Sequence, residues 1–285
     1  MADQGASSRV REVGFLDGVR YLRRPTSGPA VIFVHGFCGS GDLFDVLFDS
    51  EALGDFDLIA VDLPGHGGSV GSSGREGLEP DQYFVGAQLR GVASLVEDKP
   101  TLWVGWSLGA IPIAEFLTQD AGVNSCGVNL VGPSFAVGNK KAVERSGEAF
   151  SASLRSMLSA ERSVSADTLL EFARVVCSKD LPLFRLALVG GASLTPLAVR
   201  RATLSRDVDV EDFYRQLQLP LLITLGGSDC VMDFSPAIEM VGVGSSTASL
   251  SVYPGVGHSI FAEDTERYCS ELAEFVEFAI DRARS

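Results

Sequence analysis

The sequence has few cysteines and histidines, and neither residue type is clustered. Its five cysteines, Cys38, Cys126, Cys177, Cys230 and Cys269, are scattered and never in C-x-x-C spacing. This pattern indicates neither a disulfide framework nor a zinc site, and it suits a reducing compartment. The motifs of phosphate loops and dinucleotide-binding folds are also missing, so no metal and no organic cofactor is implied.

Long apolar runs and positive charge are scarce as well. The first residues, MADQGASSRVREVG, lack the apolar segment of a signal peptide, and no run approaches the roughly 18 apolar residues that cross a bilayer. With 23 Lys and Arg against 37 Asp and Glu, the formal net charge is -14. That charge would repel nucleic acid and anionic membranes, so we expect a cytoplasmic protein with a neutral or weakly polar small-molecule partner.

What is present is an alternation of short apolar runs and helical patterns. The 285 residues, 46% of them hydrophobic, suit one large domain or a core domain with an insertion. Asp17-Gly18 between two short apolar segments predicts a hairpin. Apolar runs at 30–36, 56–63, 101–107 and 127–132 are typical of buried parallel strands, and the segments 41–53, 80–98 and 108–119 between them have helical spacing. This alternation predicts an α/β fold, a mostly parallel sheet with helices on both faces.

From about 134 to 210 the strand pattern stops and only helical pieces remain. We interpret residues 134–210 as a helical lid, or cap, inserted into a core formed by residues 1–133 and 211–285. Its apolar stretches 181–190 and 192–199 either line an acyl pocket or form ordinary core, core being the commoner case. Strands are predicted again within 220–229 and 248–258, followed by an amphipathic helix, 265–283. The Gly- and Ser-rich segment 67–77 is predicted to be a flexible loop.

The pattern G-x-S-x-G, which holds the nucleophile of many serine hydrolases, occurs twice, at residues 105–109 and 67–71. The chemistry needs a sharp turn from a strand into a helix, with small residues on either side so that the serine stands at the sheet edge. Ser107 has a predicted strand before it and a predicted helix after it. Ser69 lies among Pro and Gly, so we expect Ser69 to be a mobile loop serine and Ser107 to be the candidate nucleophile.

A serine hydroxyl needs a general base, usually histidine, and the base needs a carboxylate to orient it. His35 and His66 precede Ser107, whereas His258 follows the last predicted strand in a Gly-rich turn. Asp229 comes just after the preceding strand and is the candidate carboxylate, with Asp233 as the fallback. Asp229 could instead be a turn residue or a helix N-cap.

An oxyanion hole requires two backbone N–H donors near the nucleophile. The N–H of Leu108, directly after the serine, is the natural first donor. The second is expected from the loop after the strand at 30–36, where Phe37 is placed for it. Phe37, Trp106 and Ser134 are the candidate residues of the substrate pocket.

The segments HGF (35–37), DLPGHGGS (62–69), GWSLG (105–109), GGSD (226–229) and GVGH (255–258) occur in an order and spacing that resemble the α/β-hydrolase superfamily. The resemblance covers nearly the whole chain outside the lid. It implies the α/β-hydrolase fold, a triad of Ser107, Asp229 and His258, oxyanion donors at Phe37 and Leu108, and a supporting role near the pocket for His35 and the 62–69 loop. Ala110 departs from relatives that have a further glycine after the elbow.

Within the superfamily the chain looks most like bacterial lid-bearing serine esterases, including carboxylesterases and N-acyl homoserine lactonases. The segment 62–69 also resembles a menaquinone-pathway synthase, and GWSLG is shared with the pimeloyl-carrier methyl esterase. The resemblance implies hydrolysis of a carboxylic ester or lactone, with an acyl homoserine lactone or a similar small apolar ester as candidate substrate. The alternatives are a lyase or carbon-carbon bond hydrolase with the same triad and, less favoured, a non-catalytic ligand receptor.

Overall fold

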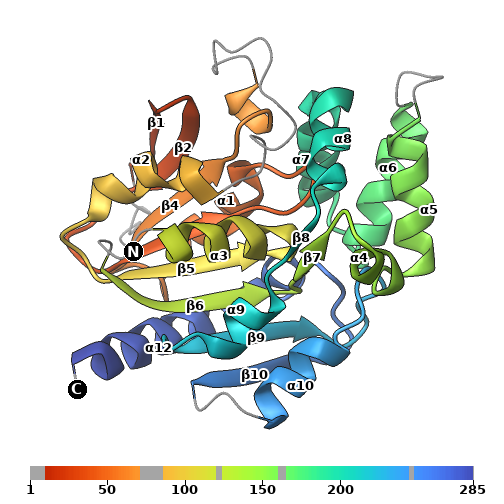
Figure 1. The fold of residues 1–285 in the computed structure, drawn as a ribbon. Coiled ribbons are helices and arrows are strands. Elements are labelled where there is room, and N and C mark those ends of the chain that lie inside the picture. The colour runs from red at the N-terminus through yellow and green to blue at the C-terminus, as the bar shows by residue number, and fades with distance from the viewer. Residues whose placement is uncertain (1–9, 71–85, 120–123, 160–164, 244–246, 285) are drawn as a thin grey trace, which may run out of the picture.

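The structure is a computed structural model that describes residues 10–70, 86–119, 124–159, 165–243 and 247–284. Its main sheet is formed by β1 (Glu12–Leu16), β2 (Val19–Arg24), β3 (Ala30–Val34), β4 (Asp57–Asp62), β5 (Thr101–Trp106), β6 (Ser125–Val131), β9 (Leu221–Gly226) and β10 (Ala248–Tyr253). The strands follow the order β1-β2-β4-β3-β5-β6-β9-β10 (Figure 1). Only the β1–β2 and β2–β4 pairings are antiparallel, so the predicted mostly parallel sheet is confirmed.

The burial of the strands explains their sequence patterns. Every residue of β3, β4 and β5 is buried, because these strands lie in the middle of the sheet and are covered on both faces. Edge strand β10 has a mixed pattern of exposure instead. At the predicted hairpin, Asp17 and Gly18 have φ values of 51° and 80°, the two positive values that this kind of tight turn requires.

Helices cover both faces of the sheet, as predicted. Helix α3 (Ala110–Gln119) packs against β5 and α2 (Leu89–Ala93), whereas α12 (Thr265–Arg284) packs against β6 and α1 (Asp45–Phe48) on the other face (Figure 1). The helix expected over 41–53 is shorter than predicted, with η1 (Gly41–Phe44) leading into α1. Buried Arg24 donates hydrogen bonds to the carbonyl oxygens of Phe48 and Leu53. These carbonyl groups at and after the end of α1 therefore have partners without a further helical turn.

Two further expectations about helices need correction. The helical pattern at 80–98 forms only η4 (Gly86–Gln88), α2 and η5 (Ser94–Val96) within its described part. Helix α10 (Ser235–Val243) was not predicted, because its apolar residues do not follow a clear helical period. The short helices α9 (Glu211–Gln216) and α11 (Ile260–Glu263) complete the core.

Between β6 and α9 lies a helical segment, residues 134–210. It contains α4 (Lys140–Glu144), α5 (Glu148–Met157), α6 (Ala166–Val176), α7 (Pro182–Leu194) and α8 (Leu197–Ser205). Contrary to the expectation of helices alone, its two ends pair as short antiparallel strands, β7 (Ala136–Val137) with β8 (Val208–Asp209). This ribbon brings the chain back to its starting point, and the five helices stand beyond the carboxyl ends of the parallel strands (Figure 1).

Side chains and caps within the sequence set the bounds of these helices. Asn139 accepts the N–H of Ala142 at the start of α4, and Ser165 accepts the N–H of Thr168 at the start of α6. Pro182 occupies the first turn of α7, where its missing N–H costs nothing.

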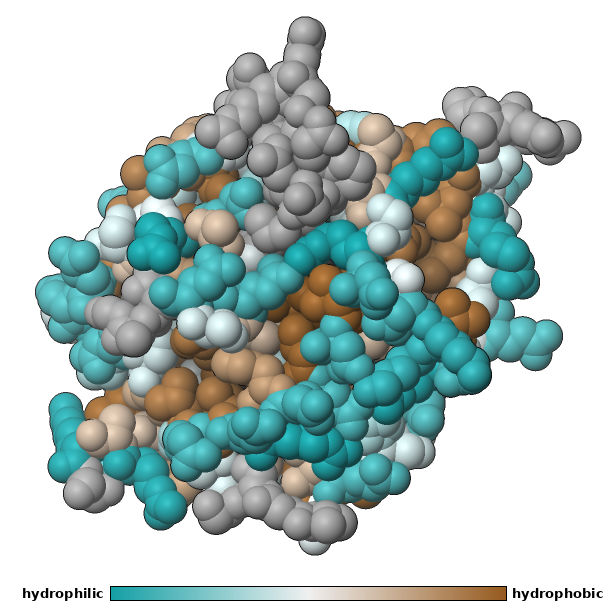
Figure 2. Space-filling view, in the orientation of Figure 1, coloured by the Kyte–Doolittle hydropathy of each residue, from teal (hydrophilic) through white to brown (hydrophobic). Residues whose placement is uncertain are grey.

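Apolar surface gathers between α8 and α5 (Figure 2). Among the described helices no single one has the length and apolarity to cross a membrane; α7 and α8 meet that test only jointly, as a pair bent by 91°.

Candidate active site

Ser107 follows β5 directly and begins the turn into α3. Its φ is 55°, in the left-handed region that serine rarely adopts, and its exposed fraction is 7%. A small residue two positions later lets the turn pass close to β3, because a Cβ on Gly109 would lie 2.3 Å from the carbonyl oxygen of Val34. The predicted strand-turn-helix context of Ser107 is present, and its strained backbone is typical of a side chain held in place for function.

His258 and Asp229 meet because β9 and β10 are parallel neighbours and both residues follow the ends of these strands. Nδ1 of His258 lies 2.6 Å from Oδ2 of Asp229, and their side chains are 2% and 0% exposed. Oδ1 of Asp229 accepts the N–H of Val231 at 2.7 Å, so Asp229 is also a turn residue. The carboxylate holds the proton of the ring on Nδ1, which makes Nε2 the nitrogen that can accept one.

Gly132 and Trp106 pack around this pair. Gly132, with a φ of 51°, follows β6, and a Cβ there would come 3.0 Å from Nδ1 of His258. Trp106 donates its indole N–H to the carbonyl oxygen of His258 at 3.1 Å, and the two rings lie 5.6 Å apart. The end of β6, where the sequence offers no carboxylate, therefore supplies the space that the histidine occupies.

The predicted oxyanion donors lie on either side of Ser107. Phe37 belongs to a turn after β3, closed by the N–H of Gly39 donating to the carbonyl oxygen of Gly36 at 3.1 Å. A Cβ on Gly36 would lie 2.9 Å from Cβ of Ser107, so this turn passes directly beside the serine. Phe37, Leu108 and Ser107 line one cavity. The donor roles of the two backbone N–H groups stay a prediction.

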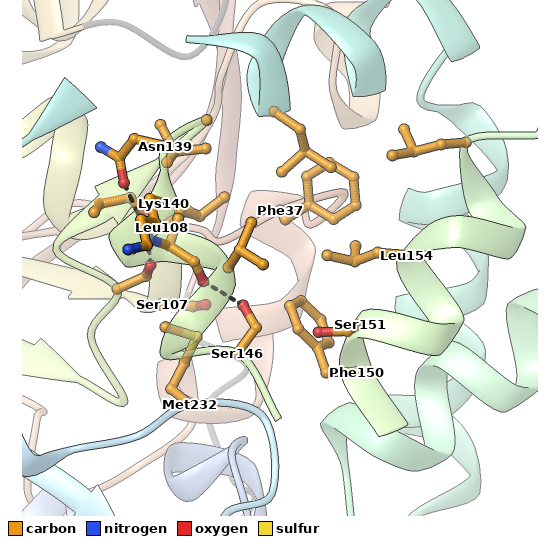
Figure 3. Close-up of a pocket in the computed structure, with 18 of the residues that line it drawn as sticks. Phe37, Ser107, Leu108, Asn139, Lys140, Ser146, Phe150, Ser151, Leu154 and Met232 are labelled. Carbon is orange, nitrogen blue, oxygen red and sulfur yellow. Dashed lines mark hydrogen bonds between the residues drawn. The ribbon is translucent and has the colours of Figure 1, made fainter. Parts of the chain in front are cut away.

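That cavity has a volume of about 480 Å³, within the range of small-molecule sites. Figure 3 shows Ser107 and Leu108 on one side of it, and Phe37, Phe150 and Leu154 on the other. The described lining residues are Phe37, Ser107, Leu108, Ser134, Ala136, Val137, Gly138, Asn139, Lys140, Ala142, Val143, Ser146, Phe150, Ser151, Leu154, Arg155, Leu158, Leu204 and Met232. Lys140 and Arg155 are the only charged residues among them, so the cavity favours neutral or anionic ligands over cations.

A second, much smaller cavity of about 10 Å³ also borders Ser107. It is lined by Gly36, Phe37, Trp106, Ser107, Phe150, Phe172, Val176 and His258. The three candidate pocket residues thus divide: Phe37 lines both cavities, Ser134 the large one and Trp106 the small one. Sequence reasoning missed Phe150 and Phe172, because nothing in their helical spacing separates a pocket wall from ordinary core.

Glu263 is a second carboxylate beside His258 that the sequence did not reveal. Its exposed fraction is 5%, and its oxygens accept hydrogen bonds from the backbone N–H groups of Ser178, Lys179, Gly257 and Ser259 and from the Ser178 hydroxyl. Two of these donors flank His258 and the others belong to the loop between α6 and α7. Glu263 therefore joins the histidine loop to the helical segment. An acidic residue five positions after the histidine carried no recognisable signal by itself.

His35 and His66 lie in the interior and support the loops around the site. Nε2 of His35 accepts the N–H of Leu63 at 3.1 Å, so the proton is on Nδ1, which donates to the carbonyl oxygen of Gly36 at 2.8 Å. The rings of His35 and His66 lie 5.0 Å apart. Burial lowers the pKa of His35 to about 4 and, helped by the neighbouring His35 ring, that of His66 to about 3. Both rings are therefore neutral at ordinary pH.

The prediction for Ser69 was wrong in one respect. Ser69 is fully buried in the short turn η2 (Gly67–Ser69), where its hydroxyl donates to the carbonyl oxygen of Asp62 at 2.7 Å and accepts the N–H of Arg20 at 2.8 Å. It is a structural serine of the core and not a mobile one, because these bonds tie it to β4 and β2. The remainder of the predicted flexible loop, 71–77, lies outside the described residues.

The fallback carboxylate, Asp233, is used elsewhere. It accepts the N–H and the hydroxyl of Ser235 at the start of α10, and these bonds lower its pKa.

The apolar stretches 181–190 and 192–199 do not line an acyl pocket, since none of their residues lines either cavity. They form core, with Phe184, Leu188 and Ala192 buried, and a Cβ on Gly191 would come 3.0 Å from the carbonyl oxygen of Cys38.

All five cysteines are free thiols. Within the described ranges no three His, Cys, Asp or Glu side chains gather as a metal site would require. Burial raises the pKa of the Cys38 thiol, in the turn that follows β3, to about 12, so this thiol is not a competing nucleophile.

Comparison with known proteins identifies the family of this chain. Residues 31–271 match the α/β hydrolase family. The chain belongs to this family. Among curated members, the chain is 27% identical over 260 residues to a pimeloyl-(acyl-carrier protein) methyl ester esterase from Xanthomonas axonopodis pv. citri, covering 87% of this chain and 95% of that protein.

Two solved structures share this architecture over nearly their whole length. An esterase from a Rhodococcus species is 26% identical with a TM-score of 0.79, covering 94% of this chain and 98% of that one. An N-acyl homoserine lactonase complexed with N-hexanoyl homoserine is 18% identical with a TM-score of 0.75, covering 95% and 98%. At the second identity the likeness concerns the fold alone. The α/β-hydrolase fold inferred from the five sequence segments is thus confirmed.

Proposed function

We propose that this α/β hydrolase cleaves carboxylic esters with Ser107 as nucleophile, His258 as general base and Asp229 as the carboxylate that orients His258. The observation that carries the proposal is His258, which lies 2.6 Å from the buried carboxylate of Asp229 and borders the same cavity as Ser107, a serine with a φ of 55°. The relatives that are named esterases support the same reaction class.

In the first half of the proposed reaction the Ser107 oxygen attacks the ester carbonyl while Nε2 of His258 takes the hydroxyl proton. The negative charge on the carbonyl oxygen is stabilised by the backbone N–H groups of Phe37 and Leu108. The tetrahedral intermediate then collapses, the carbon–oxygen bond to the alcohol breaks, and His258 returns the proton to the leaving alkoxide. An acyl group remains bound to Ser107.

In the second half a water molecule replaces the alcohol. His258 takes one proton from it, the resulting hydroxide attacks the acyl-enzyme, and the proton passes to the Ser107 oxygen as the acid leaves. One ester and one water give one acid and one alcohol. No step needs a metal or an organic cofactor.

The helical segment, residues 134–210, is the proposed lid, with residues 1–133 and 211–285 as the hydrolase core. The division is supported by the β7–β8 ribbon that closes the segment. It is also supported by the pocket lining: Phe150 of α5 lines both cavities at Ser107, and Phe172 and Val176 of α6 line the small one. Candidate substrates are open-chain esters of small molecules and lactones, including an acyl homoserine lactone.

The test is a panel of p-nitrophenyl esters, aryl esters and acyl homoserine lactones assayed with wild type and Ser107→Ala. Loss of the nucleophile should lower kcat by about 10⁴ to 10⁶-fold. Ser69→Ala is the matched control, since it alters the other G-x-S-x-G segment, and it should retain activity in the folded protein. Full activity in Ser107→Ala would refute the proposal, whereas a folded wild type that turns over no ester or lactone of the panel would favour the lyase alternative.

A further inference from the structure

The turn that carries Asp229 continues into residues 231–233, which pair with residues 145–147 at the junction between α4 and α5. The N–H of Gly147 donates to the carbonyl oxygen of Val231 at 2.8 Å. A second backbone hydrogen bond, of 2.7 Å, joins the other ends of the two segments, and their middle residues form an antiparallel bridge. The helical segment therefore pairs with the chain directly after the candidate carboxylate.

Val231 connects this bridge to the catalytic pair. Its carbonyl oxygen accepts the N–H of Gly147, while its own N–H donates to Oδ1 of Asp229 at 2.7 Å. The other carboxylate oxygen, Oδ2, lies 2.6 Å from Nδ1 of His258. Val231 is fully buried, and hydrogen bonds weaken steeply as their angle changes. A shift of Val231 that turned the carboxylate would therefore weaken its contact with the histidine.

Gly147 is required by the close approach of the two segments and not by its backbone conformation. Its φ of -60° and ψ of 151° suit any residue. A Cβ at this position would lie 1.9 Å from the carbonyl oxygen of Cys230 and 3.0 Å from the carbonyl carbon. Any side chain at position 147 must therefore push away the peptide group that joins Cys230 to Val231.

The junction between α4 and α5 is anchored on both sides of the bridge. Before it, the guanidinium of Arg145 pairs with the carboxylate of Glu211 in α9, with a nitrogen–oxygen distance of 2.9 Å. After it, Gly147 is the N-cap of α5, whose Phe150 lines both cavities. The bridge is thus fixed between α9 and the pocket wall, and it holds the turn of Asp229 at the same distance from both.

We propose that residues 145–147 position Asp229 for the reaction, and that Gly147 is the residue whose missing side chain permits this. The inference rests on the proposed function and adds to it how the carboxylate is held. The bridge also borders the large cavity, since Ser146 and Met232 both line it and lie next to each other there (Figure 3). The segment that covers the pocket therefore takes part in orienting the triad.

Gly147→Ala tests this assignment. Gly190→Ala in α7 is its matched control, because a Cβ at that position meets no atom within 4 Å. We expect Gly147→Ala to lower kcat for a p-nitrophenyl ester by about 10 to 100-fold, as a displacement of about 1 Å does, with little change in KM. Gly190→Ala should keep the kcat and the KM of the wild type.

Two further measurements separate positioning from support of the fold. The proton on Nδ1 of His258, in its short bond to Asp229, should give a far-downfield proton NMR resonance. This resonance should move upfield in Gly147→Ala and stay in place in Gly190→Ala. In an Asp229→Asn background, Gly147→Ala should lower kcat no further, because no carboxylate is left to displace.

A folded Gly147→Ala enzyme with wild-type kcat and an unshifted resonance would overturn the inference, as would an equal loss of kcat in the Asp229→Asn background. Should Gly147→Ala not fold, Arg145→Gln decides, because it removes the ion pair with Glu211 and keeps the backbone bonds of the bridge. Its kcat should fall and its resonance should move, and wild-type values of both would overturn the inference. If Asp229→Asn itself kept the wild-type kcat, the proposed function would fail whatever Gly147→Ala does.

Discussion

The carboxyl edge of the sheet and the helical segment meet at Ser107, but they are built on different principles. At the edge, Ser107, Asp229 and His258 follow the ends of parallel strands and are held by backbone turns and buried hydrogen bonds. The helical segment is held by side-chain packing and leaves leucines in solvent, with Leu183 84% and Leu186 66% exposed. In the proposed mechanism the edge determines which reaction occurs, and the helices determine which ester fits.

The largest effect is expected at the edge, from Asp229→Asn. Oδ1 of Asp229 accepts the N–H of Val231, so the Asn carbonyl would keep that bond and turn its NH₂ group toward Nδ1 of His258. The ring would then carry its proton on Nε2 and could no longer act as a base. We expect kcat for a methyl ester to fall by about 10⁴-fold with the fold unchanged.

Asp233→Asn is the control for this substitution, because the Asp233 carboxylate accepts hydrogen bonds from the N–H and the hydroxyl of Ser235 at the start of α10. Its steady-state kinetics should match those of the wild type. If Asp233→Asn and Asp229→Asn lowered kcat equally, the role given to Asp229 would be wrong.

The junction between the two regions is Glu263, and Glu263→Gln should affect both. Both carboxylate oxygens of Glu263 accept hydrogen bonds from N–H groups. In the Gln variant the side-chain NH₂ group would replace one of these oxygens, and because it is a donor it could not accept those hydrogen bonds. We expect a loss of about 1 to 3 kcal/mol in the free energy of unfolding. We also expect kcat to fall more than KM rises, because Gly257 and Ser259 flank His258.

Ser178→Ala is the matched variant on the helical side, since it removes the hydroxyl that donates to Glu263 and leaves the histidine loop untouched. It should change KM more than kcat. A Glu263→Gln enzyme that is less stable but has an unchanged kcat and pH profile would show that Glu263 only supports the fold and does not position His258.

The pH dependence of the free energy of unfolding should report on the two buried histidines, His35 and His66. The pKa of His35 is lowered to about 4 and that of His66 to about 3, while both rings have a pKa near 6.5 when unfolded. Below about pH 6.5 these two rings are protonated in the unfolded chain but remain neutral in the folded chain. The free energy of unfolding therefore falls as the pH falls. Each ring should contribute about 1.2 kcal/mol between pH 6 and pH 5.

Urea denaturation at pH 7, 6 and 5 measures this slope. His66→Gln should be less stable overall but should have a flatter dependence on pH, by about the contribution of one ring. A slope that is identical in wild type and variant would mean that His66 is charged in the folded protein.

The smallest effect is expected on the outer face of the helical segment. Leu183→Gln should change the free energy of unfolding by less than about 0.5 kcal/mol and leave kcat/KM unchanged, because the side chain is exposed. Its neighbour Phe184 is buried, so Phe184→Ala should cost about 3 to 5 kcal/mol in the same thermal or urea experiment. A loss of activity in Leu183→Gln would show that this face of α7 takes part in substrate entry.

The sequence predicted the edge well because the constraints there are local. Continuous apolar runs identify central parallel strands, and parallel strands bring their following turns to one edge. Ser107, Asp229 and His258 could therefore be expected to meet although they are far apart in the chain. The helix over 41–53 was predicted too long, since nothing local shows that Arg24 takes the carbonyl oxygens of Phe48 and Leu53.

The walls of the two cavities could not be predicted, because they depend on how helices pack on one another. Phe150 and Phe172 have the spacing of any amphipathic helix, and only the packing of α5 on α6 turns both toward Ser107. Ser69 illustrates the reverse case. Its Gly-rich surroundings are typical of a loop, yet bonds to Asp62 and Arg20 hold it in the core.

The most direct test of the central claim is to treat the folded protein with a fluorophosphonate and locate the adduct by mass spectrometry of its peptides. The two G-x-S-x-G serines then serve as test and control within one molecule. We predict one adduct per chain, on Ser107, with none on Ser69, and no labelling of Ser107→Ala. An adduct on Ser69, or a folded wild-type protein that is not labelled at Ser107, would contradict the account.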